Sequence, residues 1–389
     1  MERIMHRRTR CPACGGGAIS KGMPPHVNLR FPLLPVCVDT PRDQDVMAPF
    51  TISMCEGCGL IMLLDAADPE ALYKIFHSDG IGKVWEGHYD KFAKLIFKHA
   101  KGGRLLEIGA GQGKLMKKLL GHYGAGAGLE VIDPQYEGPA DGVKVHGTHL
   151  NPEFAEENAG KFASVVSSHT LEHFIDFNDY FADSWKCLKE GGMLFTSVPN
   201  QEFNFAKGYG NQLNFEHPSA CTNQHWLCLH YKNGFEVREV SFYSDHSVMI
   251  AAQKARAPIP YALDAKGLSE KILAQYGESI KTRIAAVRAR ALPDRENWLF
   301  GASNFSQPLF VYGLEEKHFA GVLDNSTLKH NKRLYGTSLI CRKPEEIIDA
   351  AKSDANGKRL RIFLNIGQYN AEVEGQLHGL DAGIETVLL

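Results

Sequence analysis

The 389-residue sequence has no long apolar run, no excess of charge of either sign, and few cysteines. Lys and Arg total 43 and Asp and Glu total 45, which gives a formal net charge of -2. This near-balance argues against general nucleic-acid binding, which requires a basic surface. No stretch approaches the roughly 18–20 apolar residues of a membrane span. We therefore expect neither nucleic acid nor a membrane as a partner.

The N-terminus lacks the apolar stretch of a secretory signal, because Met1–Arg10 holds four arginines and no hydrophobic run follows them. A cytoplasmic location is the default expectation. Nine cysteines are too few for a disulfide scaffold in a chain of this length, so their spacing is interpreted first for metal binding. No internal repeat or low-complexity tract is present, and the length favours two or three domains.

The distribution of apolar, polar and turn-forming residues divides the chain into four parts. Apolar runs alternate with helical segments in the second part and again in the fourth, which predicts a parallel α/β sheet in the second part and a further α/β unit in the fourth. The strand candidates of the second part are 104–108, 127–132, 163–168, 193–198 and 248–253. The predicted parts are a zinc-binding module at 1–70, an α/β domain at 71–255, a helical linker at 256–296 with its helix near 267–291, and a smaller Rossmann-like α/β module at 297–389.

Two CxxC pairs, Cys11 with Cys14 and Cys55 with Cys58, are separated by 40 residues. Each pair places two thiolates on a tight turn, and two such turns supply the four sulfur ligands of a tetrahedral structural zinc site. The alternative is a set of buried thiols or a redox pair. The double pattern favours structural zinc.

A glycine-rich loop is the strongest signal in the chain. The segment 104–113 reads as a strand that carries Glu107, followed by Gly109, Gly111 and Gly113 before a helix. Glycines let the backbone turn sharply and approach a ligand closely. Such a turn also occurs in dinucleotide enzymes.

Three details favour S-adenosylmethionine as the ligand of this loop. Glu107 lies inside the strand, where it can reach a ligand amine through water. Glu130 lies about 20 residues further on, the usual offset of a ribose-binding acid. The later segments 167–173 and 188–195 are typical of strands in a class I methyltransferase sheet. Ser168, at the end of a strand, is a further candidate for cofactor contact.

The sequence resembles the zinc-containing sugar C-methyltransferases that act on nucleotide-linked 4-keto-deoxysugars. The resemblance spans nearly the whole chain, through the two CxxC pairs and the segments 106–113, 171–176, 197–200, 214–217, 234–237, 301–303 and 322–325. It implies three parts: a four-cysteine zinc module, a class I methyltransferase domain with a Rossmann-like fold, and a C-terminal Rossmann-like module. The resemblance implies a role in deoxysugar biosynthesis, with a nucleotide-linked sugar as the substrate. The choice between a monomer and a homo-oligomer stays open.

The resemblance also implies catalytic residues. In the family a Tyr-His-Glu-His element supplies catalytic groups; Glu216 and His217 match its last two positions, and His173 is the candidate for a further histidine. We expect His217 to be the general base, Glu216 its orienter or a ligand of a substrate hydroxyl, and His173 a donor to an enolate oxygen. Asn214 and Phe215 replace the family's Tyr and His. Glu216 and His217 share a site only if their segment is a turn, because adjacent residues of a strand face opposite ways.

Other functions remain open at the level of sequence. The main alternative is an O- or N-methyltransferase of a sugar or small metabolite. A methyltransferase of RNA or protein is disfavoured by the balanced charge, although Arg7, Arg8 and Arg10 form a small basic cluster. A non-enzymatic scaffold is disfavoured by the complete set of glycines and acids. The C-terminal segments 299–304 and 322–325 imitate a nucleotide-binding unit that holds the nucleotide of the substrate or covers the cleft.

Overall fold

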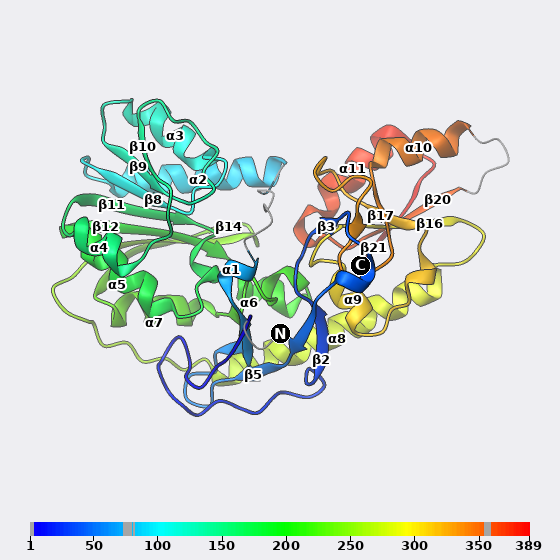
Figure 1. Ribbon diagram of the computed structural model, residues 1–389, viewed down its shortest axis with the longest axis horizontal. Helices are drawn as coiled ribbons and strands as arrows, with labels where there is room; N and C mark the ends of the chain where they lie inside the picture. The colour runs from blue at the N-terminus through cyan, green and yellow to red at the C-terminus, as the bar shows by residue number, and fades with distance from the viewer. Residues whose placement is uncertain (1–3, 73–79, 81, 354–358) are drawn as a thin grey trace.

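The computed structural model describes residues 4–72, 80, 82–353 and 359–389. Figure 1 shows two α/β units side by side, with the N-terminal segment in blue between and below them. The larger unit holds a seven-stranded sheet and the smaller unit a five-stranded sheet. The alternation of strands and helices expected from the sequence is present in both.

The seven-stranded sheet has the order β10-β9-β8-β11-β12-β15-β14. Its members are β8 (Leu105–Ile108), β9 (Leu129–Ile132), β10 (Val143–His146), β11 (Phe162–Ser168), β12 (Leu188–Pro199), β14 (Phe235–Tyr243) and β15 (Ser247–Lys254). Pairing is parallel from β10 to β12, while β15 runs antiparallel to both β12 and β14. The five predicted strand segments are confirmed as β8, β9, β11, β12 and β15. The edge strand β10 was not predicted, because half of its side chains face solvent and its apolar run is short.

Helices cover both faces of this sheet. One layer, α2 and α3, packs its apolar side chains on the face that carries Val131 and Phe195. The other layer, α4, α5 and α7, packs on the face that carries Leu106 and Val165. The helices are α2 (Lys83–His99), α3 (Lys114–Tyr123), α4 (Pro152–Glu157), α5 (Phe177–Cys187) and α7 (Asn223–Lys232). Because both faces are covered, the central strands β8, β11 and β12 are almost entirely buried.

The N-terminal part joins the two α/β units. Its strand β6 pairs with β13 of the large unit, and its strand β3 pairs with β18 of the small unit. The elements are β1 (Met5–Arg7), β2 (Leu29–Pro32), β3 (Cys37–Val38), β4 (Met47–Phe50), β5 (Ile52–Met54), β6 (Ile61–Leu63), β7 (Asp65–Ala67), α1 (Pro69–Leu72), β13 (Ser219–Ala220) and β18 (Arg333–Leu334). The N-terminal part therefore fixes how the two units face each other.

The C-terminal unit is a five-stranded parallel sheet of order β19-β17-β16-β20-β21. Its elements are β16 (Glu296–Phe300), α9 (Gln307–Val311), β17 (Gly321–Leu323), β19 (Cys341–Arg342), α10 (Pro344–Ser353), β20 (Leu360–Leu364), α11 (Asn370–Leu380) and β21 (Glu385–Leu388). The turns that follow β16 and β17 face the large unit, which places the segments 299–304 and 322–325 at the junction.

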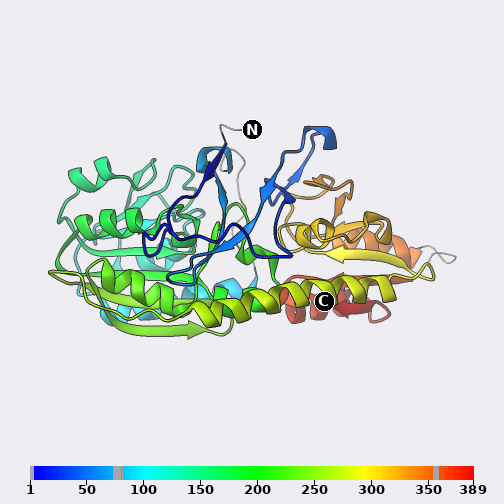
Figure 2. The same ribbon diagram turned by 90° about the horizontal axis from the view of Figure 1, so that it is seen from below.

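The long helix α8 (Lys266–Arg290) follows the segment predicted near 267–291. Figure 2 shows it running beneath both units. Its buried stripe, which includes Ile272, Tyr276 and Ile284, shares one core with the N-terminal strands and with Leu299 of β16. The short helix α6 (Gln201–Ala206) packs on α8 through Phe205 and Tyr276, whose ring centroids are 4.3 Å apart. Among the described residues, no helix is both long and apolar enough to cross a membrane.

Candidate active site

A cavity of about 1300 Å³ lies between the two α/β units. One wall comes from the turns after β8, β9 and β11 and from residues 211–217, and the opposite wall from the turns around Gly301 and Asp324. Residues 35–37 of the N-terminal part close one side. Ligands of open α/β sheets bind at the carboxyl ends of the strands, as here. The volume exceeds the roughly 300–1,000 Å³ of most single-ligand pockets, so two ligands fit.

The glycine turn after β8 forms part of this wall. Gly109 and Gly111 line the cavity and have φ values of 67° and 50°, a conformation that favours glycine. A Cβ on Gly109 would lie 2.6 Å from the Thr170 side chain. Gly113 does not line the cavity. Its φ of 67° and the 2.7 Å approach of a Cβ to Gly138 Cα give it a packing role instead.

The acid that faces the cavity after β9 is Asp133, not Glu130. Strand β9 continues to Ile132, so Asp133 is the first residue beyond its carboxyl end, and it lines the cavity. Its Oδ2 accepts a hydrogen bond from Gly111 N at 2.7 Å, and its Oδ1 accepts one from Gln135 N at 2.7 Å. The signal in the sequence was an acid directly after the last apolar residue of the strand.

Glu130 is buried inside β9 and has other partners. Its Oε1 accepts a hydrogen bond from Arg104 Nε at 2.8 Å, and its Oε2 lies 2.8 Å from His146 Nε2. Burial raises the pKa of this carboxyl, but His146 and Arg104 outweigh burial and lower it. Glu130 does not line the cavity, so its placement does not support a ribose-binding role.

Glu107 and Ser168 both line the cavity, from β8 and from the end of β11. The Ser168 hydroxyl lies 2.9 Å from His88 Nε2. His88 Nδ1 in turn lies 3.0 Å from Ser247 Oγ, and His169 Nε2 lies 2.8 Å from the same oxygen. His246 Nδ1 also contacts Ser247 Oγ, which makes this hydroxyl the centre of three imidazole rings.

His217 and His173 meet on the cavity wall, with ring centroids 4.6 Å apart. His217 Nδ1 lies 2.6 Å from the carbonyl oxygen of Asn211. A carbonyl only accepts, so Nδ1 carries the hydrogen and Nε2 of a neutral ring has a free lone pair. Burial lowers the pKa of His217, with Glu216 opposing, and this favours the neutral ring. Glu216 lines the same cavity.

Glu216 and His217 lie in a turn, which lets both side chains reach the same site. Asn214 Oδ1 accepts hydrogen bonds from the backbone N–H groups of Glu216 at 2.9 Å and of His217 at 3.2 Å. Phe215 points into the core, where its ring centroid lies 5.8 Å from that of Phe50. Asn214 and Phe215 therefore shape the turn and anchor it.

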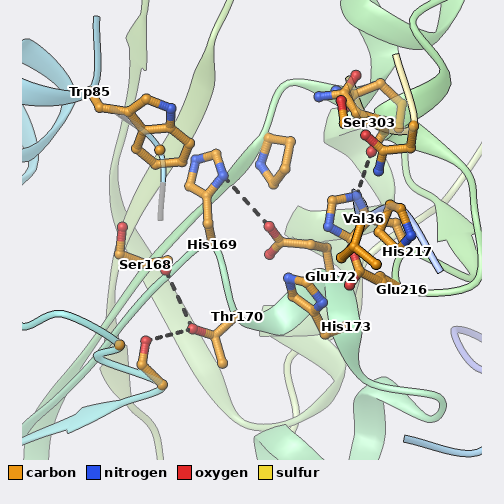
Figure 3. Close-up of a pocket in the computed structure, with 18 of the residues that line it drawn as sticks. Val36, Trp85, Ser168, His169, Thr170, Glu172, His173, Glu216, His217 and Ser303 are labelled. Carbon is orange, nitrogen blue, oxygen red and sulfur yellow. Dashed lines mark hydrogen bonds and ion pairs between the residues drawn. The ribbon is translucent and has the colours of Figure 1, made fainter. Parts of the chain in front are cut away.

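Glu172 is a cavity residue to which the sequence analysis assigned no role. It belongs to the 3-10 helix η2 (Leu171–His173) and is completely buried. A carboxylate oxygen of Glu172 and one ring nitrogen each of His173 and His217 lie within 4.8 Å of one another (Figure 3). Burial raises the pKa of Glu172 to about 8. Its position beside His173 in the sequence was visible, but its burial was not.

Residues 84–255 match the family model described as a methyltransferase domain. The chain contains a class I S-adenosylmethionine-dependent methyltransferase domain. The human mitochondrial ubiquinone biosynthesis O-methyltransferase is 28% identical over 142 residues. That alignment covers 31% of this chain and 36% of the relative, so the chain spans about a third of the length of the curated relative it matches.

Solved methyltransferase structures also align with this chain. A possible histamine N-methyltransferase from Thermotoga maritima aligns with a TM-score of 0.35 and 19% identity, covering 44% of this chain and 91% of that chain. A geranyl diphosphate C-methyltransferase from Streptomyces coelicolor aligns with a TM-score of 0.35 and 16% identity, covering 46% of this chain and 90% of that chain.

The four cysteines of the two CxxC pairs converge at one point beside the methyltransferase domain. Cys11 Sγ lies 3.6 Å from Cys58 Sγ, and Cys14 Sγ lies 3.6 Å from Cys55 Sγ. All four sulfurs lie within 4.8 Å of one another. Tetrahedral zinc with Zn–S bonds of about 2.3 Å requires S–S distances of about 3.8 Å, so the set fits zinc and is too wide for disulfides.

Proposed function

We propose that this protein transfers a methyl group from S-adenosylmethionine to a nucleotide-linked keto sugar, at the carbon beside the ketone. The observation that carries the proposal is the position of His217. Its ring presents a lone pair to a cavity that extends from the glycine turn of the methyltransferase domain to the C-terminal sheet. A carbon next to a ketone becomes nucleophilic only after it loses a proton, and a neutral histidine suits that task.

The cofactor end of the cavity has the groups that S-adenosylmethionine requires. Gly109 and Gly111 provide backbone without a Cβ, and Asp133 provides a carboxylate for the ribose hydroxyls. Glu107 and Ser168 are further contacts in this proposal. When bound, the cofactor supplies an electrophilic methyl group on a cationic sulfur.

His217 and its neighbours have separate roles in the proposed reaction. His217 Nε2 accepts the proton from the substrate carbon, and His173 donates a hydrogen bond to the enolate oxygen that forms. Glu216 holds a hydroxyl of the sugar or orients His217. His217 holds the proton after the transfer and then gives it to solvent, so the net reaction releases one proton.

The nucleotide end of the substrate is assigned to the C-terminal module. Gly301 and Asp324 mark the carboxyl ends of β16 and β17 and line the cavity. Lys332 and Lys329 line the same wall, and we assign a diphosphate to them. Lys329 Nζ also pairs with Asp324 Oδ2 at 2.8 Å. Zinc, held by the four cysteines, is proposed as a structural ion, because a site with four cysteine ligands leaves no open position for chemistry.

Product analysis tests this proposal. The protein is incubated with S-adenosylmethionine and a thymidine diphosphate-linked 4-keto-6-deoxy sugar, and the product is examined by NMR. We expect a new methyl group bonded to carbon. The His217→Gln variant should lose turnover while it binds S-adenosylhomocysteine like the wild type. Retained turnover in that variant contradicts the base assignment.

O-methylation is the second candidate, since the matched curated relative is named an O-methyltransferase. It needs only a free hydroxyl, from which His217 would accept the proton. A methyl group on oxygen in the same NMR experiment supports this candidate and excludes the carbon chemistry.

A further inference from the structure

Glu172 lies on the cavity wall, where its carboxyl group is buried without a hydrogen bond from the described residues. The residue has no exposed surface, and neither carboxyl oxygen has a hydrogen-bond partner among the described residues. A buried carboxylate without a hydrogen bond or a cation is costly. Figure 3 shows the side chain between His169 on one side and His173 and His217 on the other. The ring nitrogen nearest to it on the first side, His169 Nδ1, is 3.6 Å away, too far for a hydrogen bond.

Among the residues that the structure describes, no lysine or arginine pairs with the Glu172 carboxyl. Titratable side chains close to it are His169, His173, His217, Tyr180 and Cys221. Tyr180 is occupied by a hydrogen bond with Ser167 at 2.7 Å.

His169 is the neighbour whose protonation would change this conclusion. Its other nitrogen belongs to the cluster around Ser247 Oγ, which His88 and His246 also contact. One hydroxyl donates one hydrogen bond and accepts two, so it satisfies three neutral imidazoles, two as donors and one as acceptor. Burial and the neighbouring rings lower the pKa of His169 well below its usual value. His169 is therefore neutral and does not hold Glu172 in its ionised form.

We propose that Glu172 is a catalytic acid, which in its protonated form donates a hydrogen bond to the carbonyl oxygen of the substrate while His217 removes the carbon-bound proton. The inference rests on the proposed function. It pairs a neutral acid with a neutral base, whose polar atoms lie within 4.8 Å of each other. A carboxylate at this place would repel the enolate, whereas the neutral O–H stabilises it.

Protons and electrons balance in this step. The C–H bond breaks and its proton moves to His217 Nε2, while the electron pair forms a C=C bond and the carbonyl becomes an enolate. Glu172 keeps its proton and shares it with the enolate oxygen, beside His173. The enolate electron pair would then form the new C–C bond to the methyl group of the bound cofactor, and the carbonyl would return. The bond from that methyl to sulfur would break, and its electron pair would stay on the neutral thioether of S-adenosylhomocysteine. The proton on His217 then passes to solvent.

The protonation state of Glu172 is measured first, on the full-length protein labelled with ¹³C at the glutamate carboxyl. The resonance that is absent from Glu172→Gln belongs to Glu172. We expect it to titrate near pH 8. Titration near pH 4 would overturn the proposal, and this result does not depend on the identity of the substrate.

Turnover of the thymidine diphosphate-linked 4-keto-6-deoxy sugar then tests the role. The wild type should lose kcat above about pH 8, where the acid ionises. Glu172→Gln keeps an N–H donor and cannot ionise, so it should retain activity within about 10-fold and lose this alkaline limb. Glu172→Met has no donor and should lose about 10²–10³-fold in kcat, with unchanged S-adenosylhomocysteine affinity. The control Asp179→Asn, on the same cavity wall, should keep the alkaline limb.

Three further outcomes would overturn the proposal. They are full activity in Glu172→Met, an alkaline limb that persists in Glu172→Gln, and a stoichiometric divalent metal that is lost with Glu172→Gln but retained when a zinc-module cysteine is replaced. A wild type that is inactive on keto sugars refutes the proposed function. The carboxyl titration then still decides whether Glu172 is a neutral acid, which keeps the two failures distinct.

Discussion

The contrast between Asp133 and Glu130 yields the sharpest prediction. Glu130 lies within β9 and Asp133 directly after it, but only Asp133 lines the cavity. We expect Asp133→Asn to weaken binding of S-adenosylhomocysteine, whose ribose is that of the cofactor. Glu130→Gln should leave this affinity unchanged within about threefold and lower stability instead.

The magnitude follows from the hydrogen bonds. Each oxygen of Asp133 already accepts one backbone N–H, from Gly111 or Gln135, and each retains capacity for one ribose hydroxyl. A hydrogen bond to a charged group contributes about 1.5–3 kcal/mol. Asparagine keeps one acceptor oxygen without the charge, so we expect a loss of about 2–3 kcal/mol, or about 30- to 150-fold in Kd.

Glu130→Gln removes the charge that pairs with Arg104 and His146. Breaking a buried pair costs about 3–5 kcal/mol, but the Arg104 side chain is 40% exposed, so solvent screening reduces the expected loss to about 1–2 kcal/mol. Isothermal titration calorimetry measures the affinities and thermal unfolding measures the stabilities of both variants. Affinity that collapses in Glu130→Gln and survives in Asp133→Asn would refute the reasoning.

Four further predictions concern the metal, the base, the buried acid and the glycine turn. One zinc per chain should be found by elemental analysis, and Cys55→Ser should lose it and lower Tm; a protein with a full complement of zinc in this variant would contradict the four-cysteine site. Turnover should persist to a lower pH than the ordinary histidine pKa would allow, because burial lowers the pKa of His217 and only the neutral ring accepts a proton; an acid limb above the ordinary histidine value of about 6.5 would argue against this base. The folded-state pKa of Glu172 is raised to about 8, so its contribution to stability is complete below about pH 4.5 and is lost as pH rises through 8. The free energy of unfolding, measured with denaturant, should therefore fall between about pH 5 and 9 more in the wild type than in Glu172→Gln. An equal pH dependence in the two proteins would contradict this prediction. Gly113→Ala should lower the free energy of unfolding by about 1–2 kcal/mol, because a Cβ would meet Gly138 at 2.7 Å with φ at 67°; chemical denaturation measures this, and an unchanged midpoint would contradict the packing role.

Local patterns were enough to locate most elements of the fold. The strands β8, β11 and β12 are buried on both faces, so their short apolar runs stand out in the sequence. The helix α8 was visible because its apolar residues recur at helical spacing. Edge strands carry a weaker signal, and β10 was missed for that reason.

The candidate site was predicted in part. Gly109 and Gly111 of the glycine turn, His173, Glu216 and His217 were all named from the sequence, and the structure brings these five to one cavity. Glu130, the acid predicted for the ribose, does not line the cavity, whereas Asp133, three residues further on, does. The end of β9 depends on its pairing with β8 and β10 rather than on composition.

The sequence by itself determined the class of the catalytic domain, the two cysteine pairs and the histidine-bearing turn, because each rests on residues close together in the chain or on short motifs. Only the tertiary structure decided which groups are buried together. Glu172 and His217 are far apart in the sequence, and the burial that raises the pKa of the Glu172 carboxyl arises from the packing of η2 against the strands of the sheet and the turn at 211–217. Desolvation is a property of the folded surroundings and not of any local pattern, and so the acid of the proposed pair became visible only in the structure.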